Sequence, residues 1–121
     1  MLKMTNMNEN SESQNTEDEE QRRPISIDRL IHEPARYNIM ANLCAIDNAD
    51  FLFLLRKTGL TWGNLSAHLN KLEAAGYIKI KKEILDKKPH TLAAITQKGQ
   101  LAFQAYRLDM IRILCILPSS E

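Results

Sequence analysis

Residues 60–82 read LTWGNLSAHLNKLEAAGYIKIKK, and this stretch decides the fold. It opens with Thr61, a residue that favours the N-cap position of a helix because its hydroxyl can accept a hydrogen bond from a free backbone N–H. The apolar side chains that follow repeat at i, i+4 and i+7, at Leu65, Leu69 and Leu72. This spacing puts them on one face, so we expect a helix over 61–75 whose leucine stripe faces a core.

A hairpin is expected directly after this helix. Gly76 suits the left-handed conformation that commonly ends a helix, and residues 77–85 (YIKIKKEIL) alternate in the manner of a strand with one solvated face. Residues 86–90 (DKKPH) are typical of a turn, and residues 91–96 (TLAAIT) of a returning strand. The lysines of the first strand are expected to face solvent: Lys79, Lys81 and Lys82.

The segment before Thr61 predicts a second helix close by. Asp50 is a good N-cap for residues 51–59 (FLFLLRKTG), where apolar side chains on nearly all sides indicate a buried helix and Gly59 marks its end. Only a very short turn separates the two helices, which is the arrangement of a helix-turn-helix unit. A helix-turn-helix followed by a hairpin is a winged helix, so the predicted fold class is mainly α with a small β-hairpin (α+β).

The side of the 61–75 helix opposite the leucines carries small and amide side chains. At 100° per residue this outward side holds Gly63, Asn64, Ser66, Ala67, Asn70 and Lys71, with Trp62 and His68 on its flanks. Small residues allow a close approach to a DNA groove, amides can bond base edges in pairs, and the free N–H groups at the helix start can hold a phosphate. We favour partial burial for Trp62 over a DNA contact. His68 fits packing at the helix edge as well as a phosphate contact.

The charge distribution points to a polyanionic partner. The formal net charge is only +1, but residues 1–24 hold six acids against three bases, whereas residues 56–98 hold nine bases against three acids. The basic part coincides with the predicted helix and hairpin, so double-stranded DNA is the expected partner. The alternative is a winged helix that serves protein contacts or an architectural role without sequence-specific DNA binding. The predicted DNA-contacting set is completed by Thr61 and by Lys81, Lys87, Lys88 and His90 of the hairpin.

Composition divides the chain after Pro24. Residues 1–24 have almost no apolar side chains to offset the entropy of ordering, which predicts a disordered acidic and polar tail. Residues 25–118 are expected to form one winged-helix domain. It should begin with a capped turn near Asp28, followed by a helix that carries Pro34 in its first turn.

The last predicted helix follows a cap at Thr96 and is apolar on too many sides for one small domain. Its first half shows a stripe of Leu101, Ala105 and Leu108, and farther on apolar residues cover most of the circumference. Such a helix needs a partner, most simply the same helix of a second copy. A two-fold dimer would place two reading helices about one DNA turn apart, roughly 34 Å, and predicts a pseudo-palindromic site. The alternative is that the helix folds back and closes the core of its own protomer.

Other classes of function find no support in the residues. Cys44 and Cys115 lie among apolar neighbours and are expected to be buried, reduced thiols rather than a disulfide or a metal pair. His32, His68 and His90 have no ligand-spaced cysteine or acid, so we expect neither a metal nor a cofactor. No catalytic motif is present, and an enzyme is not expected. Without a signal peptide or a membrane-length apolar run, the protein should be soluble and cytoplasmic.

Residues from about 27 to 108 also resemble a known family. The resemblance rests on the stretches IHEPARYNIMANL, ADFLFLLRKTGLTWGNLSAHLNKLEAAGYIKI, KKPHTLAAIT and KGQLAFQAY. They are similar to the short winged-helix transcriptional regulators of bacteria and archaea, related to the MarR and ArsR families. The resemblance implies a homodimer that binds a short inverted-repeat operator, with a reading helix over 61–75 and a wing over 83–90.

The resemblance also implies that the first and last helices form the dimer contact. The residues expected there are Leu30, Ile31, Tyr37, Phe103, Tyr106, Met110, Ile113, Leu114 and Leu117. The paired-cysteine metal motif of many ArsR sensors is absent from this sequence, and we expect no second domain that could hold a large ligand. A small apolar effector could enter between the dimer helices and the reading head, although no cluster of residues in the sequence points to one.

Overall fold

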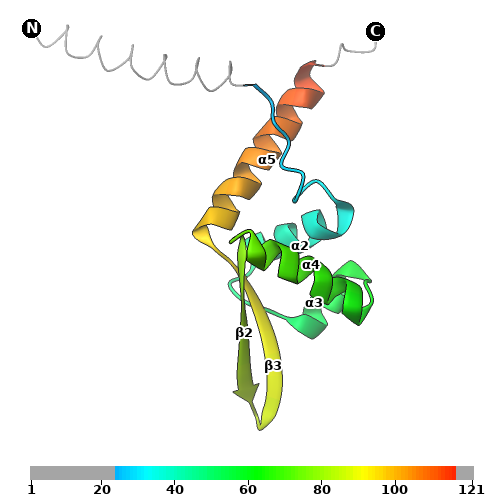
Figure 1. Ribbon diagram of the computed structural model, residues 1–121, viewed down its shortest axis with the longest axis vertical. Coiled ribbons are helices and arrows are strands. Elements are labelled where there is room, and N and C mark those ends of the chain that lie inside the picture. The colour runs from blue at the N-terminus through cyan, green and yellow to red at the C-terminus, as the bar shows by residue number, and fades with distance from the viewer. Residues whose placement is uncertain (1–23, 117–121) are drawn as a thin grey trace, which may run out of the picture.

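The computed structural model describes residues 24–116 and has the winged-helix fold that the sequence predicts (Figure 1). Its elements are α2 (Pro34–Ala45), β1 (Ala49–Asp50), α3 (Phe51–Thr58), α4 (Trp62–Ala74), β2 (Ile78–Leu85), β3 (Lys88–Ile95) and α5 (Gln97–Ile116). Helices α2, α3 and α4 gather beside the base of the β2–β3 hairpin, which projects away from them, and α5 leads off on the other side (Figure 1). The predicted tail up to residue 23, together with Leu117 and Pro118, lies outside the described residues.

The helix caps are those expected from the sequence. The Asp50 side chain accepts a hydrogen bond from the backbone N–H of Leu52, and the Thr61 hydroxyl accepts one from Asn64 at 3.3 Å. Gly59 ends α3 in the left-handed region, and Gly76 follows α4 in the same conformation, at φ of 67° and 81°. These caps fix the lengths of α3 and α4 and the short turn between them.

Between residues 24 and 33, the chain before α2 forms one turn and no helix. The Asp28 carboxylate accepts hydrogen bonds from the backbone N–H groups of Leu30 and Ile31, as expected of a cap. Its other oxygen accepts the Tyr77 hydroxyl at 2.5 Å. Burial, followed by this hydrogen bond and the carboxylate charge, raises the pKa of Tyr77 to about 12. The turn is therefore held against the start of β2.

The sheet has three antiparallel strands in the order β1-β3-β2, and β1 was not predicted from the sequence. The hairpin stays paired from Ile78 opposite Ile95 to Leu85 opposite Lys88. The predicted five-residue turn over 86–90 is therefore wrong, because the turn consists of Asp86 and Lys87 alone, both with positive φ. Two-residue turns of this kind match the twist of the strands they join.

The core lies where the helices meet the base of the sheet. The leucine stripe of α4 is buried, as predicted. The largest fully buried side chains around it are Ile31, Ile39, Met40, Leu43, Leu54 and Ile78. The expectation that α3 is buried on nearly all sides is wrong, since Leu52 remains 50% exposed. Cys44 and Cys115 are also exposed, not buried, although neither forms a disulfide.

Helix α5 has two different faces. Phe103 and Tyr106 are buried against the protomer, where the Phe103 ring meets that of Tyr37 edge-on at 5.6 Å. The predicted stripe is on the other face, with Leu101 and Leu108 at 59% and 50% exposure. The first half of α5 thus folds back onto its own domain through one face only.

This packing corrects part of the expected dimer contact. Ile31, Phe103 and Tyr106 are buried in the core of their own protomer, so they have almost no surface left for a partner. Tyr37, at 45%, and Leu114, at 65%, remain exposed.

None of the helices within residues 24–116 combines the length and the apolar character needed to span a bilayer.

Candidate nucleic-acid interface and adjoining pocket

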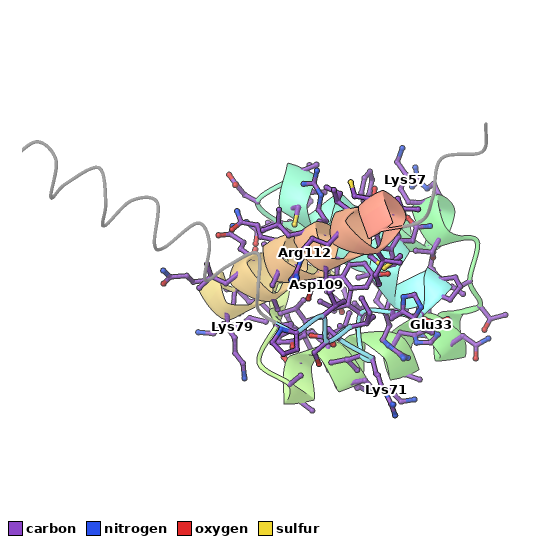
Figure 2. The ribbon with its side chains drawn as sticks, turned by 90° about the horizontal axis from the view of Figure 1, so that it is seen from above. Glu33, Lys57, Lys71, Lys79, Asp109 and Arg112 are labelled. Atoms are coloured by element: carbon purple, nitrogen blue, oxygen red, sulfur yellow. The ribbon has the colours of Figure 1, made fainter. Side chains whose placement is uncertain are left out.

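The outward face of α4 is free of core packing, as the sequence predicts. Five of its residues are exposed, namely Gly63, Asn64, Ala67, Asn70 and Lys71, and Ser66 between them is partly buried. A Cβ atom placed on Gly63 would meet no heavy atom within 4 Å, so the surface is open at the start of the helix. Lys71 points away from the helical body (Figure 2). The face can therefore approach a groove closely and offer amide and ammonium groups to it.

Trp62 at the start of α4 is less buried than expected. Its ring lies against that of Phe51 with centroids 4.2 Å apart, yet 60% of the residue is exposed. The contact with Phe51 holds the indole beside the exposed N-terminus of α4, where Thr61 is also exposed. The indole N–H is a hydrogen-bond donor, so this position suits a phosphate or sugar contact.

His68 is turned toward α2. Its Nδ1 lies 3.1 Å from a guanidinium nitrogen of Arg36 and 3.8 Å from a carboxylate oxygen of Glu33. Because a guanidinium can only donate, Nδ1 accepts this hydrogen bond. Of the two roles expected for His68, the structure shows packing at the helix edge. The side chain connects α4 to the start of α2.

Glu33 holds this cluster together. Its carboxylate caps α2 by accepting a hydrogen bond from the backbone N–H of Arg36 at 2.8 Å. Burial by itself raises the pKa of Glu33, but the backbone N–H groups of Arg36 and Ala35 and the charges of His68 and Arg36 outweigh it, and the pKa lies below its ordinary value. Glu33 is thus an anion whose oxygens reach both α2 and the edge of α4.

The lysines of the wing are exposed. They are Lys79, Lys81 and Lys82 on β2, with Lys87 and Lys88 at the tip. The Lys81 ammonium lies 2.8 Å from Glu83, and this hydrogen bond raises the pKa of Lys81. Lys79 points outward from the start of the hairpin (Figure 2). The lysines at 82, 87 and 88 complete a basic hairpin next to α4.

Two polar contacts fix the wing relative to the helices. The Nδ1 atom of His90 lies 2.8 Å from the carboxylate of Asp50, the N-cap of α3. This hydrogen bond, followed by the one from Leu52 N–H, lowers the pKa of Asp50. On the other strand, the Ile80 N–H donates to Glu73 of α4 at 2.8 Å. His90 is therefore engaged within the protomer, and helix and wing keep one relative orientation.

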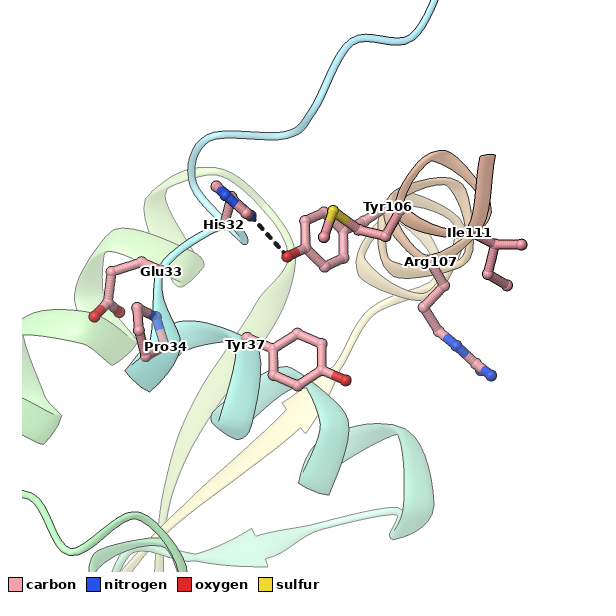
Figure 3. Close-up of a pocket in the computed structure, with 8 residues that line it drawn as sticks. His32, Glu33, Pro34, Tyr37, Tyr106, Arg107 and Ile111 are labelled. Carbon is pink, nitrogen blue, oxygen red and sulfur yellow. Dashed lines mark hydrogen bonds between the residues drawn. The ribbon is translucent and has the colours of Figure 1, made fainter. Parts of the chain in front are cut away.

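A pocket of about 550 Å³ adjoins this interface on the side of α5 (Figure 3). Its lining comes from the turn before α2, from α2 and from α5, and includes His32, Tyr37, Tyr106, Arg107, Met110 and Ile111. The Tyr106 hydroxyl and the His32 Nδ1 are 2.8 Å apart across one wall. Burial, and then the nearby Tyr37, raise the pKa of Tyr106, which keeps the phenol protonated.

The pocket is the part of the site that the sequence did not reveal. Glu33 is also among the lining residues, but its carboxylate points away from Tyr106 and Ile111 (Figure 3) and lies 3.8 Å from His68. Its other residues are far apart in the chain, and no short motif joins them. Among the described residues, no group of three or more His, Cys, Asp or Glu side chains is placed to hold a metal ion.

Comparison with known proteins adds to this geometry. A family model described as a winged helix DNA-binding domain matches residues 35–114. An uncharacterized protein of Methanocaldococcus jannaschii is 33% identical over 85 residues, which cover 70% of this chain and 92% of that protein.

Two solved structures illustrate the likeness. A transcriptional regulator homologue from Pyrococcus horikoshii OT3 has a TM-score of 0.68 and 29% identity, covering 72% of this chain and 86% of that one. A mutant of MarR from E. coli shares the fold, with a TM-score of 0.60 and 16% identity over 67% of this chain and 59% of its own.

Proposed function

Because this chain belongs to the winged helix DNA-binding domain family, we propose that it is a MarR-like transcriptional regulator that binds a pseudo-palindromic operator as a homodimer. The observation that carries this proposal is the outward face of α4. That face is left out of the core, carries small, amide and basic side chains, and adjoins a basic hairpin. Occupancy of a promoter would then suffice for repression in the cytoplasm.

The proposed contacts divide into two kinds. Asn64, Ser66, Asn70 and Lys71 would read base edges or hold nearby phosphates, while Gly63 and Ala67 let the helix backbone come close. Lys87 and Lys88 would hold phosphates and add affinity that does not depend on sequence. Thr61 and Trp62 would contact the backbone at the start of α4. Lys81, His68 and His90 already have partners in the protomer, so their main role would be to position helix and wing.

The proposed dimer uses the outer face of α5. Leu101, Leu108, Ile111 and Leu114 are all at least half exposed. At 100° per residue, Leu101 and Leu108 lie opposite Phe103 and Tyr106, Ile111 lies next to Leu108, and Leu114 extends the contact near the end of the helix. Burying these four side chains against a second copy is favourable, since each would contribute of the order of 1 kcal/mol or more. Tyr37 packs against Phe103 and Tyr106, and Leu30, Met110 and Ile113 are partly buried, so these four residues would contribute less to the contact.

A direct test compares a double asparagine variant with a single asparagine control. The Asn64→Ala, Asn70→Ala double variant removes the amides from the outward face of α4 without touching the core. It should lose preference for the operator over random duplex by at least 10-fold, because each lost bidentate contact costs about 1–3 kcal/mol of discrimination. Asn48→Ala, at an exposed position outside α4, is the control and should keep that preference. Equal preference in all three proteins would contradict the assignment of α4 as the reading helix.

The pocket favours a second role as an effector site. Its mixture of two tyrosines, one arginine and apolar side chains suits a small aromatic carboxylate. Since Glu33 lines the edge of the pocket and its carboxylate lies 3.8 Å from His68, a ligand that shifts this segment would disturb the contact between Glu33 and α4. Titration of the protein–operator complex with benzoate, followed by fluorescence anisotropy, tests this role. If benzoate releases the wild-type protein from DNA but not the Arg107→Ala variant, the result supports the effector site. If benzoate affects the wild type and the variant equally, the result contradicts it.

A further inference from the structure

The tip of the wing carries an apolar side chain that the protomer does not use. Ile84 is 78% exposed, more than any other large apolar residue of the described chain, and the adjacent Leu85 is 46% exposed. Pro89 lies directly opposite Ile84 in the hairpin register and is exposed too. Directly opposed residues share one face of a hairpin, so Ile84 and Pro89 form a two-residue apolar patch near the tip.

The patch lies near the end of a regular, fully paired hairpin. The strands remain in register up to Leu85 and Lys88, and the turn between them has only two residues. Figure 1 shows that this end of the hairpin projects away from α2, α3 and α4. Ile84 and Pro89 are therefore free to meet a partner outside the protomer.

The surrounding charges select the kind of partner. Lys82 lies on the same face as Ile84, two residues earlier on β2, and Lys87 and Lys88 follow at the tip. Of the two carboxylates nearby, Glu83 is engaged by Lys81 at 2.8 Å, and Asp86 is exposed in the turn, where Lys82, Lys87 and Lys88 outnumber it. An apolar patch set among ammonium groups complements a polyanion with an apolar interior, and not an apolar protein surface. Duplex DNA has this combination, because stacked bases lie between two rows of phosphates.

We propose that Ile84, supported by Pro89, enters the minor groove next to the site read by α4, opens a base step and bends the duplex at each wing. This inference rests on the proposed DNA binding. Proteins that bend DNA commonly insert Ile, Leu or Pro side chains from the minor groove, and the neighbouring lysines would hold the flanking phosphates. Pyrimidine–purine steps open most easily, so the protein should prefer DNA that has such a step under the wing. This preference would arise without a hydrogen bond from the protein to the bases of that step.

The test uses two variants of the same shape. Ile84→Val keeps an apolar wedge, and Ile84→Thr has the shape of valine with one methyl group replaced by a hydroxyl. Both residues favour strands, so the hairpin should fold in each. The probe is a duplex recovered with the wild-type protein from a random pool, labelled at both ends for energy transfer. At saturation the wild type and Ile84→Val should bring the ends closer. Ile84→Thr should leave the duplex nearly straight, bind it roughly 10-fold more weakly and keep the same salt dependence.

The outcomes separate this inference from DNA binding itself. Equal bending by Ile84→Val and Ile84→Thr would overturn the wedge, as would a wild-type complex in which the duplex stays straight, and in both cases DNA binding would stand. A wild-type protein that binds no duplex from the pool would overturn both proposals. A second readout replaces the pyrimidine–purine step under the wing by an A-tract. This change should weaken the wild type several-fold and leave Ile84→Thr unaffected.

Discussion

The exposed lysines at the wing tip allow a quantitative prediction. Lys87 lies in the two-residue turn beside Asp86, and Lys88 begins β3 opposite Leu85; both lysines are exposed. If both hold phosphates, the Lys87→Ala, Lys88→Ala double variant should bind every DNA sequence more weakly. Its affinity should also depend less on salt, because fewer counterions are released when the complex forms.

The size of the effect follows from the number of phosphate contacts. Each contact contributes about 0.9 to the slope of log K against log salt, so two lysines in each of two wings contribute roughly 3.6. Between 50 and 200 mM salt, that part of the slope corresponds to roughly 100-fold in affinity. The wild type should therefore lose about 100-fold more affinity over this interval than the double variant.

Fluorescence anisotropy with a labelled duplex over a series of salt concentrations measures the slope directly. Lys57→Ala is the control, since Lys57 lies on α3 and on the opposite side of the molecule from Lys71 (Figure 2). It removes a positive charge but should leave the slope unchanged. An unaltered slope in the double variant, or an equal change in the control, would refute the proposed role of the wing tip.

Three further predictions concern packing, assembly and pH. Gly99→Ala should destabilise the fold by about 1–3 kcal/mol in urea unfolding, because the new Cβ atom would lie 2.1 Å from a backbone carbonyl oxygen. Gly63→Ala is the control, because its Cβ atom would meet no heavy atom within 4 Å. It should stabilise the fold by about 0.5–1 kcal/mol. The Leu108→Ser, Ile111→Ser variant should be monomeric by light scattering, and an unchanged dimer mass would place the contact elsewhere. Asp50→Asn keeps the helix cap but removes a carboxylate whose pKa is lowered on folding. The stabilisation from that charge is complete above about pH 4 and is lost as the pH falls through the lowered pKa. The stability gap between wild type and Asp50→Asn should therefore close in acid, and a constant gap would contradict the role of the charge.

Much of the fold was predictable because local signals agree. Asp50, Thr61 and Thr96 are cap residues placed before apolar repeats, and each caps a helix in the structure. Strand β1 was missed because it has two residues, too few to show a pattern. The hairpin turn was placed too broadly because Asp86 and Lys87 adopt positive φ without a glycine, and the proline and charged residues nearby looked equally typical of a turn.

The terminal helix shows where periodicity stops being informative. When apolar residues occupy most of a helix, their spacing cannot tell which face turns inward. The aromatic residues Phe103 and Tyr106 took the inner face, and Leu101 and Leu108 the outer one. The exposed face of α4 could be predicted because its leucine stripe occupies one side only. The pocket could not be predicted from the sequence, because its residues are brought together only by the packing of α5 on α2.

The most direct test of the central claim is selection of duplexes from a random DNA pool by the full-length protein, with the mass of the complex measured alongside. The proposal predicts enrichment of an inverted repeat whose half-sites lie about one helical turn apart, bound by two copies of the chain. Binding without any enriched sequence, lost at moderate salt, would contradict it and favour an architectural or protein-binding winged helix.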